Sequence, residues 1–369
     1  MIYIQNTTDF YSAMRLCESA PANQPLSAVT LGKFDGLHRG HQKLLNRILQ
    51  LQSDGYYGIV FSIAPEDRTA LFTPEEKRHF LESYGVDCMI RCPFVPDILG
   101  MEPEAFIAEV LCRQLRAKYI VVGTDFRFGF QRKGDAAFLK KMQKKYNFTL
   151  IVEEKECYEG REISSTYIRE ALASADMELV RTLMGHWFPV EGTVLHGHQL
   201  GRKIGMPTIN IRPDGYKLLP PPGVYYSDVI LKRDETSRIT NDIKNTANSD
   251  AINVFDERDT LSDLPDKKID GCDRVISTDL QRTSDIYSSG AGISTCHGIT
   301  NIGYKPTVDG TFLGVETYLY GIHETLYGAD VTVLLRHFRR PEQKFVSVED
   351  LKAQMTQDIR SGEEYFGGK

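Results

Sequence analysis

The strongest constraint on the fold is a change of pattern near residue 186. Before this point, short apolar runs alternate with stretches of helical periodicity, and the runs are Ala28 to Leu31, Gly58 to Ile63, Tyr119 to Val122 and Phe148 to Val152. Such alternation is typical of a mostly parallel α/β sheet. After Trp187, strand-like segments rich in β-branched and aromatic residues are separated by glycine and proline. This second pattern predicts a small β-barrel or a sandwich.

The chain is long enough for two domains of these kinds. It has 369 residues, of which 41% are hydrophobic, so each half can bury a core of its own. We predict one domain over residues 1–185 and a second over residues 186–369. A closing helix is indicated by a capping pattern at Ser347 and Asp350 and by apolar residues at helical spacing, namely Val348, Leu351, Met355 and Ile359.

A polar segment interrupts the second domain at about residues 233–297. It is rich in Asp, Ser, Thr, Asn and charged residues, and its scattered aliphatic residues follow no sustained period. Because it cannot bury enough apolar surface to offset the entropy of ordering it, we expect a disordered insertion. A loop can lengthen in this way at small entropic cost.

Composition excludes several classes of protein. The formal net charge of −6 argues against broad neutralisation of nucleic-acid phosphates. No segment approaches the ~18 consecutive apolar residues of a membrane span. The seven cysteines are an odd number without a C-x-x-C pair, which fits neither a disulfide framework nor a zinc knuckle. We therefore expect a cytoplasmic protein that acts on small molecules, without nucleic-acid or membrane partners and with at most weak self-association.

The first chemical pattern is a strand, a glycine turn and a helix start in AVTLGKFDGLHRGHQKLLNRIL. Gly32 and Gly36 allow a tight turn, and a helix N-terminus after such a turn is a natural phosphate site. His38 and His41 lie three residues apart, so both imidazoles can face one bound phosphate. Two surface histidines beside a turn are the alternative. The buried strand before them and the amphipathic helix after them favour the phosphate site.

This segment also carries a family resemblance. Its pattern G-x-F-D-G-x-H-x-G-H resembles the nucleotidyltransferase motif of bacterial bifunctional riboflavin kinase/FAD synthetases, as do GTDFRFG (Gly123 to Gly129), the dipeptide Gly134-Asp135 and ISSTYIR (Ile163 to Arg169). The resemblance implies a Rossmann-like α/β nucleotidyltransferase domain with His38 and His41 as catalytic residues and a Mg²⁺ ion. The implied nucleotide-binding residues are Gly32, Phe34, Asp35, Gly36, Asp125, Ser164, Ser165, Thr166 and Arg169.

The ATP phosphates would lie at the start of the ISSTYIR helix, where free backbone N–H groups, hydroxyls and one guanidinium are available. A simple helix cap is the alternative interpretation of these serines. One turn departs from the family, because the usual Pro-His-Pro after the second strand is replaced here by Ala64-Pro65-Glu66-Asp67. Since that turn helps to shape the flavin side, the change bears on FMN adenylylation more than on nucleotide binding.

The second chemical pattern is GRKIGMPTIN, Gly201 to Asn210, which resembles the riboflavin kinase signature G-R-x-x-G-x-P-T-x-N. The resemblance implies that nucleotide and metal are bound by Gly201, Arg202, Gly205, Pro207, Thr208 and Asn210. Thr208 and Asn210 are two apart on an extended segment, so their oxygens share one side, which suits Mg²⁺ and ATP phosphates. A Pro-Thr turn whose Asn satisfies its own backbone is the alternative.

Two later segments, GITNIGYKPT (Gly298 to Thr307) and GVETYLYG (Gly314 to Gly321), also resemble riboflavin kinase elements. Glu316 stands at the position of the general base on the ribityl hydroxyl, and Asn301 would lie near ATP or the flavin. A solvated strand residue is the other interpretation of Glu316. The domain implied is a small antiparallel β-barrel with a C-terminal helix.

The whole resemblance implies two ATP-dependent reactions: phosphorylation of riboflavin to FMN, and adenylyl transfer to FMN that gives FAD and pyrophosphate. Two alternatives remain open. One is a riboflavin kinase with a weak or differently specific N-terminal nucleotidyltransferase, and the other is a non-catalytic flavin-binding module.

Overall fold

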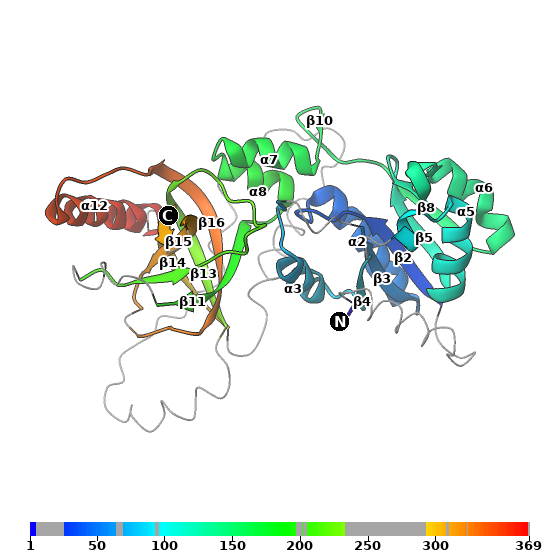
Figure 1. Ribbon diagram of the computed structural model, residues 1–369, viewed down its shortest axis with the longest axis horizontal. Coiled ribbons are helices and arrows are strands. Elements are labelled where there is room, and N and C mark those ends of the chain that lie inside the picture. The colour runs from blue at the N-terminus through cyan, green and yellow to red at the C-terminus, as the bar shows by residue number, and fades with distance from the viewer. Residues whose placement is uncertain are drawn as a thin grey trace, which may run out of the picture.

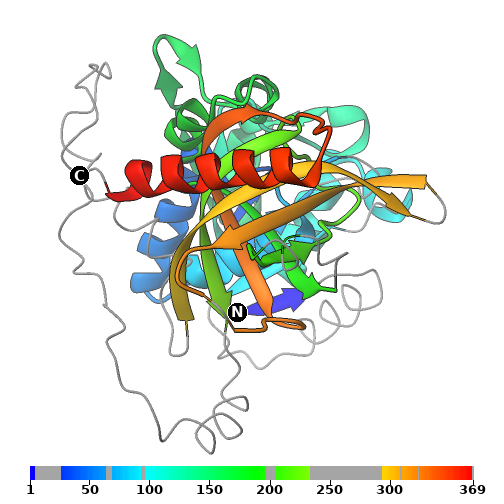
Figure 2. The same ribbon diagram turned by 90° about the vertical axis from the view of Figure 1, so that its left-hand side faces the viewer.

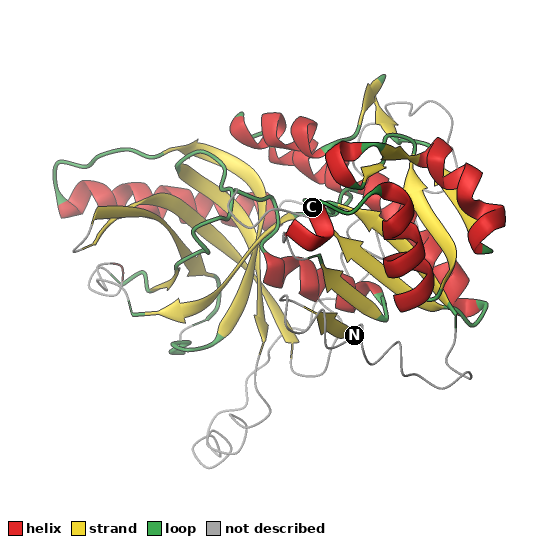
Figure 3. Ribbon diagram, turned by 45° about the vertical axis from the view of Figure 1, so that its right-hand side comes forward, coloured by secondary structure: helices red, strands yellow, loops and turns green. Residues whose placement is uncertain are grey.

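The computed structural model describes residues 1–4, 26–63, 69–92, 96–196, 201, 205–232, 293–307, 310–322 and 324–367. A helix-covered sheet and a β-barrel lie side by side, with a pair of helices between them (Figures 1 and 3). Among the described helices, none is long and apolar enough to cross a membrane.

The N-terminal unit is built on a six-stranded sheet in the order β1-β4-β3-β2-β5-β8. All five strand pairs are parallel, as the apolar runs predicted. The strands are β1 (Ile2–Ile4), β2 (Ser27–Gly32), β3 (Tyr57–Ser62), β4 (Cys88–Arg91), β5 (Ala117–Gly123) and β8 (Thr149–Glu153). The short β1 and β4 were not expected, because three or four residues carry too little pattern to reveal a strand.

Helices cover both faces of this sheet (Figure 1). Alternate strand residues point to opposite faces, so Val60 and Val121 belong to one core cluster, and Phe61 and Val122 belong to the other. The helices are α2 (Arg39–Ser53), α3 (Pro74–Tyr84), the π-helix η1 (Phe106–Gln114) and α6 (Ala136–Tyr146). Short elements complete the unit: α4 (Pro96–Leu99), α5 (Pro103–Ala105), β6 (Arg127–Phe128), η2 (Phe130–Arg132), β7 (Gly134–Asp135), β9 (Cys157–Tyr158) and β10 (Arg161–Glu162).

The strand order reverses at β2. The chain adds β3 and β4 on one side of β2, and then crosses to add β5 and β8 on the other side. In open α/β sheets, ligands bind in the crevice at the carboxyl ends of the strands where the order reverses. Here the reversal lies where β2 runs into the His38 turn and where β5 runs toward Asp125.

The C-terminal unit is a closed antiparallel barrel in the order β11-β12-β15-β14-β13-β16. Of the two folds that the sequence predicted for this unit, the barrel is therefore the one observed. Its strands are β11 (Phe188–Leu195), β12 (Thr208–Ile211), β13 (Gly223–Lys232), β14 (Ile293–Thr307), β15 (Gly310–Leu319) and β16 (Asp330–Pro341). One expected boundary needs correction, because residues 293–297 belong to β14 and not to the insertion. Polar residues there obscure the strand, which is defined by its pairing with β13. Residues 233–292 lie outside the described residues.

Three further helices belong to the described part of the chain. α7 (Ser165–Ala173) and α8 (Met177–Met184) lie between the sheet and the barrel, and α12 (Val348–Gly367) lies across the barrel (Figure 2). The backbone N–H of Asp350 donates to the Ser347 hydroxyl at 3.0 Å, so the predicted cap forms. The Tyr320 hydroxyl donates to the Ile359 carbonyl at 2.6 Å, which fixes α12 to the barrel.

Candidate active sites

The turn between β2 and α2 has an unusual backbone. Phe34, Gly36 and Leu37 all have positive φ, at 50°, 81° and 42°. Each non-glycine residue in this region costs roughly 1–3 kcal/mol, and such strain is concentrated at ligand sites. The turn is held by packing, because the Phe34 and Leu37 side chains are fully buried. At Gly36 a Cβ atom would lie 2.8 Å from Leu71 Cδ1, so only glycine fits there.

The two histidines of the motif form a stacked pair. Their ring centroids are 3.7 Å apart, with 27° between the ring planes. Burial lowers the pKa of His38 to about 4, and burial together with the His38 charge lowers the pKa of His41. Both rings are therefore neutral at pH 7. Within the described part of the chain, neither Nδ1 atom has a hydrogen-bond partner, although both are buried. A phosphate oxygen would satisfy such a nitrogen and favour its protonation.

Asp35 connects this turn to α7. The Arg169 guanidinium donates to its Oδ2 at 2.7 Å, and the backbone N–H of Leu71 donates to its Oδ1 at 2.8 Å. The Ser165 hydroxyl donates to the Asp35 carbonyl at 3.0 Å. Ser164 is the N-cap of α7 and accepts from the backbone N–H of Tyr167 at 3.2 Å. The predicted ISSTYIR segment thus starts a helix beside the histidine turn, and Ser164 also acts as a cap.

The other predicted nucleotide-binding residues are placed differently. Thr166 is exposed on the first turn of α7. Asp125 is exposed just beyond β5, where it pairs with Lys155 at 3.1 Å, and its charge acts on His38. Gly32 ends β2, whereas the Phe34 ring packs in the core, 5.2 Å from the His41 ring. The departing turn at residues 64–67 lies outside the described residues.

Sequence reasoning missed Lys77 of α3. Its ammonium is buried and donates to the Lys33 carbonyl at 2.9 Å and to the Ser62 hydroxyl at 3.1 Å. It therefore lies at the carboxyl ends of β2 and β3. Burial lowers the pKa of Lys77 to about 8. No local signal could have singled it out, because one lysine on a helix is ordinarily a surface residue.

The second site is a cavity of about 280 Å³ between the barrel and α12. Barrel residues on its wall include Thr208, Asn301 and Glu316, and Gly201 lies at the same wall. On the side of the cavity formed by α12, the apolar residues Leu351, Met355 and Ile359 accompany the carboxylate of Asp358. Three of the four residues predicted from helical spacing therefore face this cavity, whereas Val348 is exposed.

A polar row crosses three strands of this cavity wall. Glu316 of β15 is the register partner of Asn210 on one side and of Asn301 on the other. Register partners share a face of the sheet, so the three side chains lie together, with Thr208 two residues from Asn210. Lys305 forms an ion pair with Glu316. Glu316 is thus a partly buried cavity residue.

Lys305 was also missed, although a signal existed. It lies four residues after Asn301 on β14, and the period of two in a strand places both on one face.

The remaining residues of the GRKIGMPTIN segment are placed as follows. Gly205 has φ of 81° and requires glycine, while Pro207 and Thr208 border a smaller hollow. A Cβ atom on Gly201 would lie 2.3 Å from the Met206 carbonyl. Arg202 lies outside the described residues.

The donor set in the barrel is compatible with Mg²⁺. No cluster of three or more His, Cys, Asp or Glu residues able to hold a metal occurs in the described ranges. The hydroxyl of Thr208 and the amide of Asn210 offer oxygen ligands, and the carboxylate of Glu316 adjoins Asn210 in the register. Mg²⁺ is commonly held by few protein oxygens together with substrate phosphates, so a sparse oxygen set of this kind fits it.

Comparisons with known proteins match a separate family model to each unit. The family model for FAD synthetase matches residues 20–167, and that for riboflavin kinase matches residues 184–366. The Escherichia coli K12 protein named bifunctional riboflavin kinase/FMN adenylyltransferase is 30% identical, covering 94% of this chain and 95% of its own length. The protein of that name from Buchnera aphidicola of Acyrthosiphon pisum is 32% identical, covering 92% and 93%.

A solved structure supports the fold alone. The crystal structure titled as a macrolide-efflux protein from Streptococcus pneumoniae has a TM-score of 0.67 and 23% identity, covering 92% of this chain and 95% of that one. The resemblance of the motifs is confirmed by the full-length relatives, since it extends over nearly the whole chain. The chain belongs to the bifunctional riboflavin kinase/FMN adenylyltransferase family.

Proposed function

We propose that this chain converts riboflavin to FAD in two ATP-dependent steps. Residues 186–369 would transfer the γ-phosphoryl group of ATP to riboflavin, and residues 1–185 would transfer AMP from ATP to the FMN formed. The observation that carries the proposal is that each unit assembles its own site: the stacked histidines at the sheet's reversal point, and the Glu316 row in the barrel cavity.

In the kinase step, Glu316 accepts the proton of the ribityl hydroxyl as that oxygen attacks the γ-phosphorus. Lys305 beside it forms an ion pair with this carboxylate and holds its orientation. Thr208 and Asn210 would hold a Mg²⁺ ion, which neutralises phosphate charge when it is bound. Asn301 and the signature residues Gly201, Arg202, Gly205 and Pro207 would line the path of ATP and flavin.

In the adenylyl step, a phosphate oxygen of FMN attacks the α-phosphorus of ATP, the bond to the β-phosphate breaks, and pyrophosphate leaves. The enzyme aligns these groups and stabilises the developing charge. His38 and His41 suit this role, because their stacked rings are neutral in the free site and a nearby anion would raise their pKa. Ser164, Ser165, Thr166 and Arg169 would hold the departing phosphates, while Gly32, Phe34, Asp35, Gly36 and Asp125 would shape the nucleotide site.

The direct test is to incubate the protein with riboflavin, ATP and Mg²⁺ and to follow flavins by chromatography. FMN should appear first and FAD after it, and FMN supplied directly should give FAD. Accumulation of FMN without FAD would favour the kinase with a weak or differently specific N-terminal half. Flavin binding without turnover would favour a non-catalytic module. Repeating the assay with Mn²⁺ compares the two metals.

The proposal carries three smaller expectations. The protein should act in the cytoplasm, its partners should be small molecules and not nucleic acid, and self-association should be weak. Gel filtration over a range of concentrations would measure self-association.

A further inference from the structure

A short segment of the N-terminal unit lies between the histidine turn and the kinase half. Ala70 forms a parallel bridge with Lys217, in which its N–H donates to the Tyr216 carbonyl and its carbonyl accepts from the Leu218 N–H, both at 2.8 Å. Residues 216–218 follow β12 and therefore belong to the kinase half. The next residue, Leu71, donates its N–H to Asp35 at 2.8 Å.

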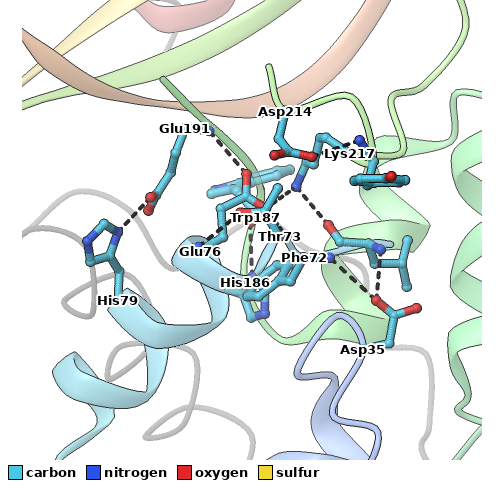
Figure 4. A network of polar contacts seen from close by, with 12 residues as sticks. Asp35, Phe72, Thr73, Glu76, His79, His186, Trp187, Glu191, Asp214 and Lys217 are labelled. Carbon is cyan, nitrogen blue, oxygen red and sulfur yellow. Dashed lines mark hydrogen bonds and ion pairs between the residues drawn. The ribbon is translucent and has the colours of Figure 1, made fainter. Parts of the chain in front are cut away.

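The Lys217 side chain reinforces this junction (Figure 4). Its ammonium donates to the Leu71 carbonyl at 2.7 Å and forms an ion pair with Glu76 of α3 at 2.7 Å. Both side chains are only 1% exposed. The other carboxylate oxygen of Glu76 accepts from the backbone N–H of Glu191 on β11 at 3.1 Å. The pair thus bridges α3, the segment at Leu71 and two parts of the barrel unit.

Stability alone is a weak reason for such a pair. Burial raises the pKa of Glu76 and lowers the pKa of Lys217, and each charge offsets part of the shift in the other. Because both ions lose water, a buried ion pair often stabilises a fold no more than apolar residues of similar size would. What the pair does provide is a fixed direction for the Leu71 backbone, whose amide orients Asp35.

From Asp35 the contacts continue into the adenylyltransferase site. Its other carboxylate oxygen holds Arg169, and its carbonyl holds Ser165. The Leu71 side chain lies against Gly36 in the histidine turn. A shift of Leu71 would therefore move Arg169 and the turn that carries His38 at the same time.

We propose that Lys217, a residue of the kinase half, is a positioning residue for adenylyl transfer, acting through Leu71 and Asp35 on Arg169 and the histidine turn. The inference rests on the proposed function. It means that the adenylyltransferase site is complete only when the barrel unit supplies Lys217.

The test uses the full chain and two variants, Lys217→Met and the double variant Glu76→Gln with Lys217→Met. The double variant leaves no unpaired buried charge, so it keeps the test usable where the single variant folds poorly. The matched control is His79→Gln, because His79 also joins α3 to Glu191, at 2.6 Å, but does not contact the Leu71 segment. FMN adenylylation and riboflavin phosphorylation are measured on the same preparations.

We expect kcat for FMN adenylylation to fall by about 10- to 100-fold in both Lys217 variants, because displaced catalytic groups cost this much in rate. KM for FMN should change little. Riboflavin phosphorylation should match wild type, and His79→Gln should match wild type in both reactions. Wild-type adenylylation in the Lys217 variants would overturn the inference, as would an equal loss in His79→Gln or a parallel loss of kinase turnover.

A second measurement separates positioning from general loosening of the fold. Lys217→Met is combined with Asp35→Asn, which weakens the contact to Arg169. Lys217→Met lowers the adenylylation rate by one factor in the wild-type background and by another in the Asp35→Asn background. If Lys217 acts through Asp35, the factor in the Asp35→Asn background should be much smaller. Full additivity would overturn the proposed route. Absence of FAD synthesis in the wild type would instead contradict the proposed function.

Discussion

His38 and His41 face two opposing demands at the scale of single residues. Burial in the strained turn keeps their imidazoles neutral, whereas adenylyl transfer at the proposed site would develop negative charge beside them. The two demands would be compatible, because a phosphate bound beside the rings would raise the pKa of the imidazoles. On the proposed assignment, their proton affinity would then depend on whether the site is occupied.

We predict that the double substitution His38→Ala with His41→Ala abolishes FAD formation but leaves riboflavin phosphorylation intact. Both rings belong to the N-terminal site, and the kinase cavity lies in the barrel. Chromatography of FMN and FAD measures both reactions in one assay. His337→Ala serves as the control, because that histidine pairs with Glu178 away from the turn. FAD synthesis at the wild-type rate would disprove the assignment of the two histidines.

Glu316→Gln should stop the kinase step while supplied FMN is still converted to FAD. The carboxamide keeps the size of the side chain but cannot accept the ribityl proton, and general-base assistance is worth about 10²- to 10⁴-fold. Because Thr208 and Asn210 are unchanged, the loss should fall on kcat more than on KM. Glu342→Gln is the matched control, since Glu342 is a second carboxylate at the same cavity. Loss of turnover in the control alone would assign the base to Glu342.

At the scale of elements, the junction between α8 and β11 joins the two units. α8 ends at Met184 and is capped by Gly185, whose φ is 78°. His186 then packs against Phe72 and Phe80, with ring centroids 5.5 and 4.9 Å away. The Gln42 amide donates to the Met184 carbonyl at 2.7 Å, which fixes α2 to the same junction. Burial lowers the pKa of His186 to about 4.

This depressed pKa predicts acid sensitivity. The unfolded state, with a histidine pKa near 6.5, binds the proton more readily than the folded state, so stability falls as pH drops from about 6.5 to about 4. Between pH 7 and pH 4.5 this linkage lowers the stability of the fold by about 2 to 3 kcal/mol. Between pH 7 and pH 4.5, the free energy of unfolding should therefore fall less in His186→Gln than in wild type. The difference between the two falls should be about 2 to 3 kcal/mol, as measured by urea titration. An equal loss in variant and wild type would show that His186 is not buried as a neutral ring.

At the scale of the whole molecule, the two units share one core. A single cluster of buried residues continues from Val60 in the sheet through Leu183 and Phe188 to Val333 in the barrel. In the sequence, residues 233–292 separate β13 from β14, two strands that pair with each other. Lys232 and Ile293 are register partners in β13 and β14, so the barrel can close without the intervening residues.

We predict that deletion of residues 235–290 leaves both activities largely intact. Four residues then link Lys232 to Ile293, a length that is common in β-hairpins. The deleted chain should elute as a folded protein and convert riboflavin to FAD at a rate close to wild type. A shorter deletion of residues 250–275 is the control for loop length. Loss of folding in the longer deletion would mean that this segment contributes to the core.

The sequence by itself determined the classes of the two units and the segments that carry their chemistry, because strand and helix periods, glycine turns and the two long motifs are local patterns. It also located Thr208, Asn210 and Glu316 as candidates. Only the tertiary structure decided that the barrel closes, that β14 begins at Ile293, and that Lys305 lies against Glu316. The junction through Lys217 depends on residues about 140 positions apart, and no local pattern records which distant backbone a buried side chain will meet.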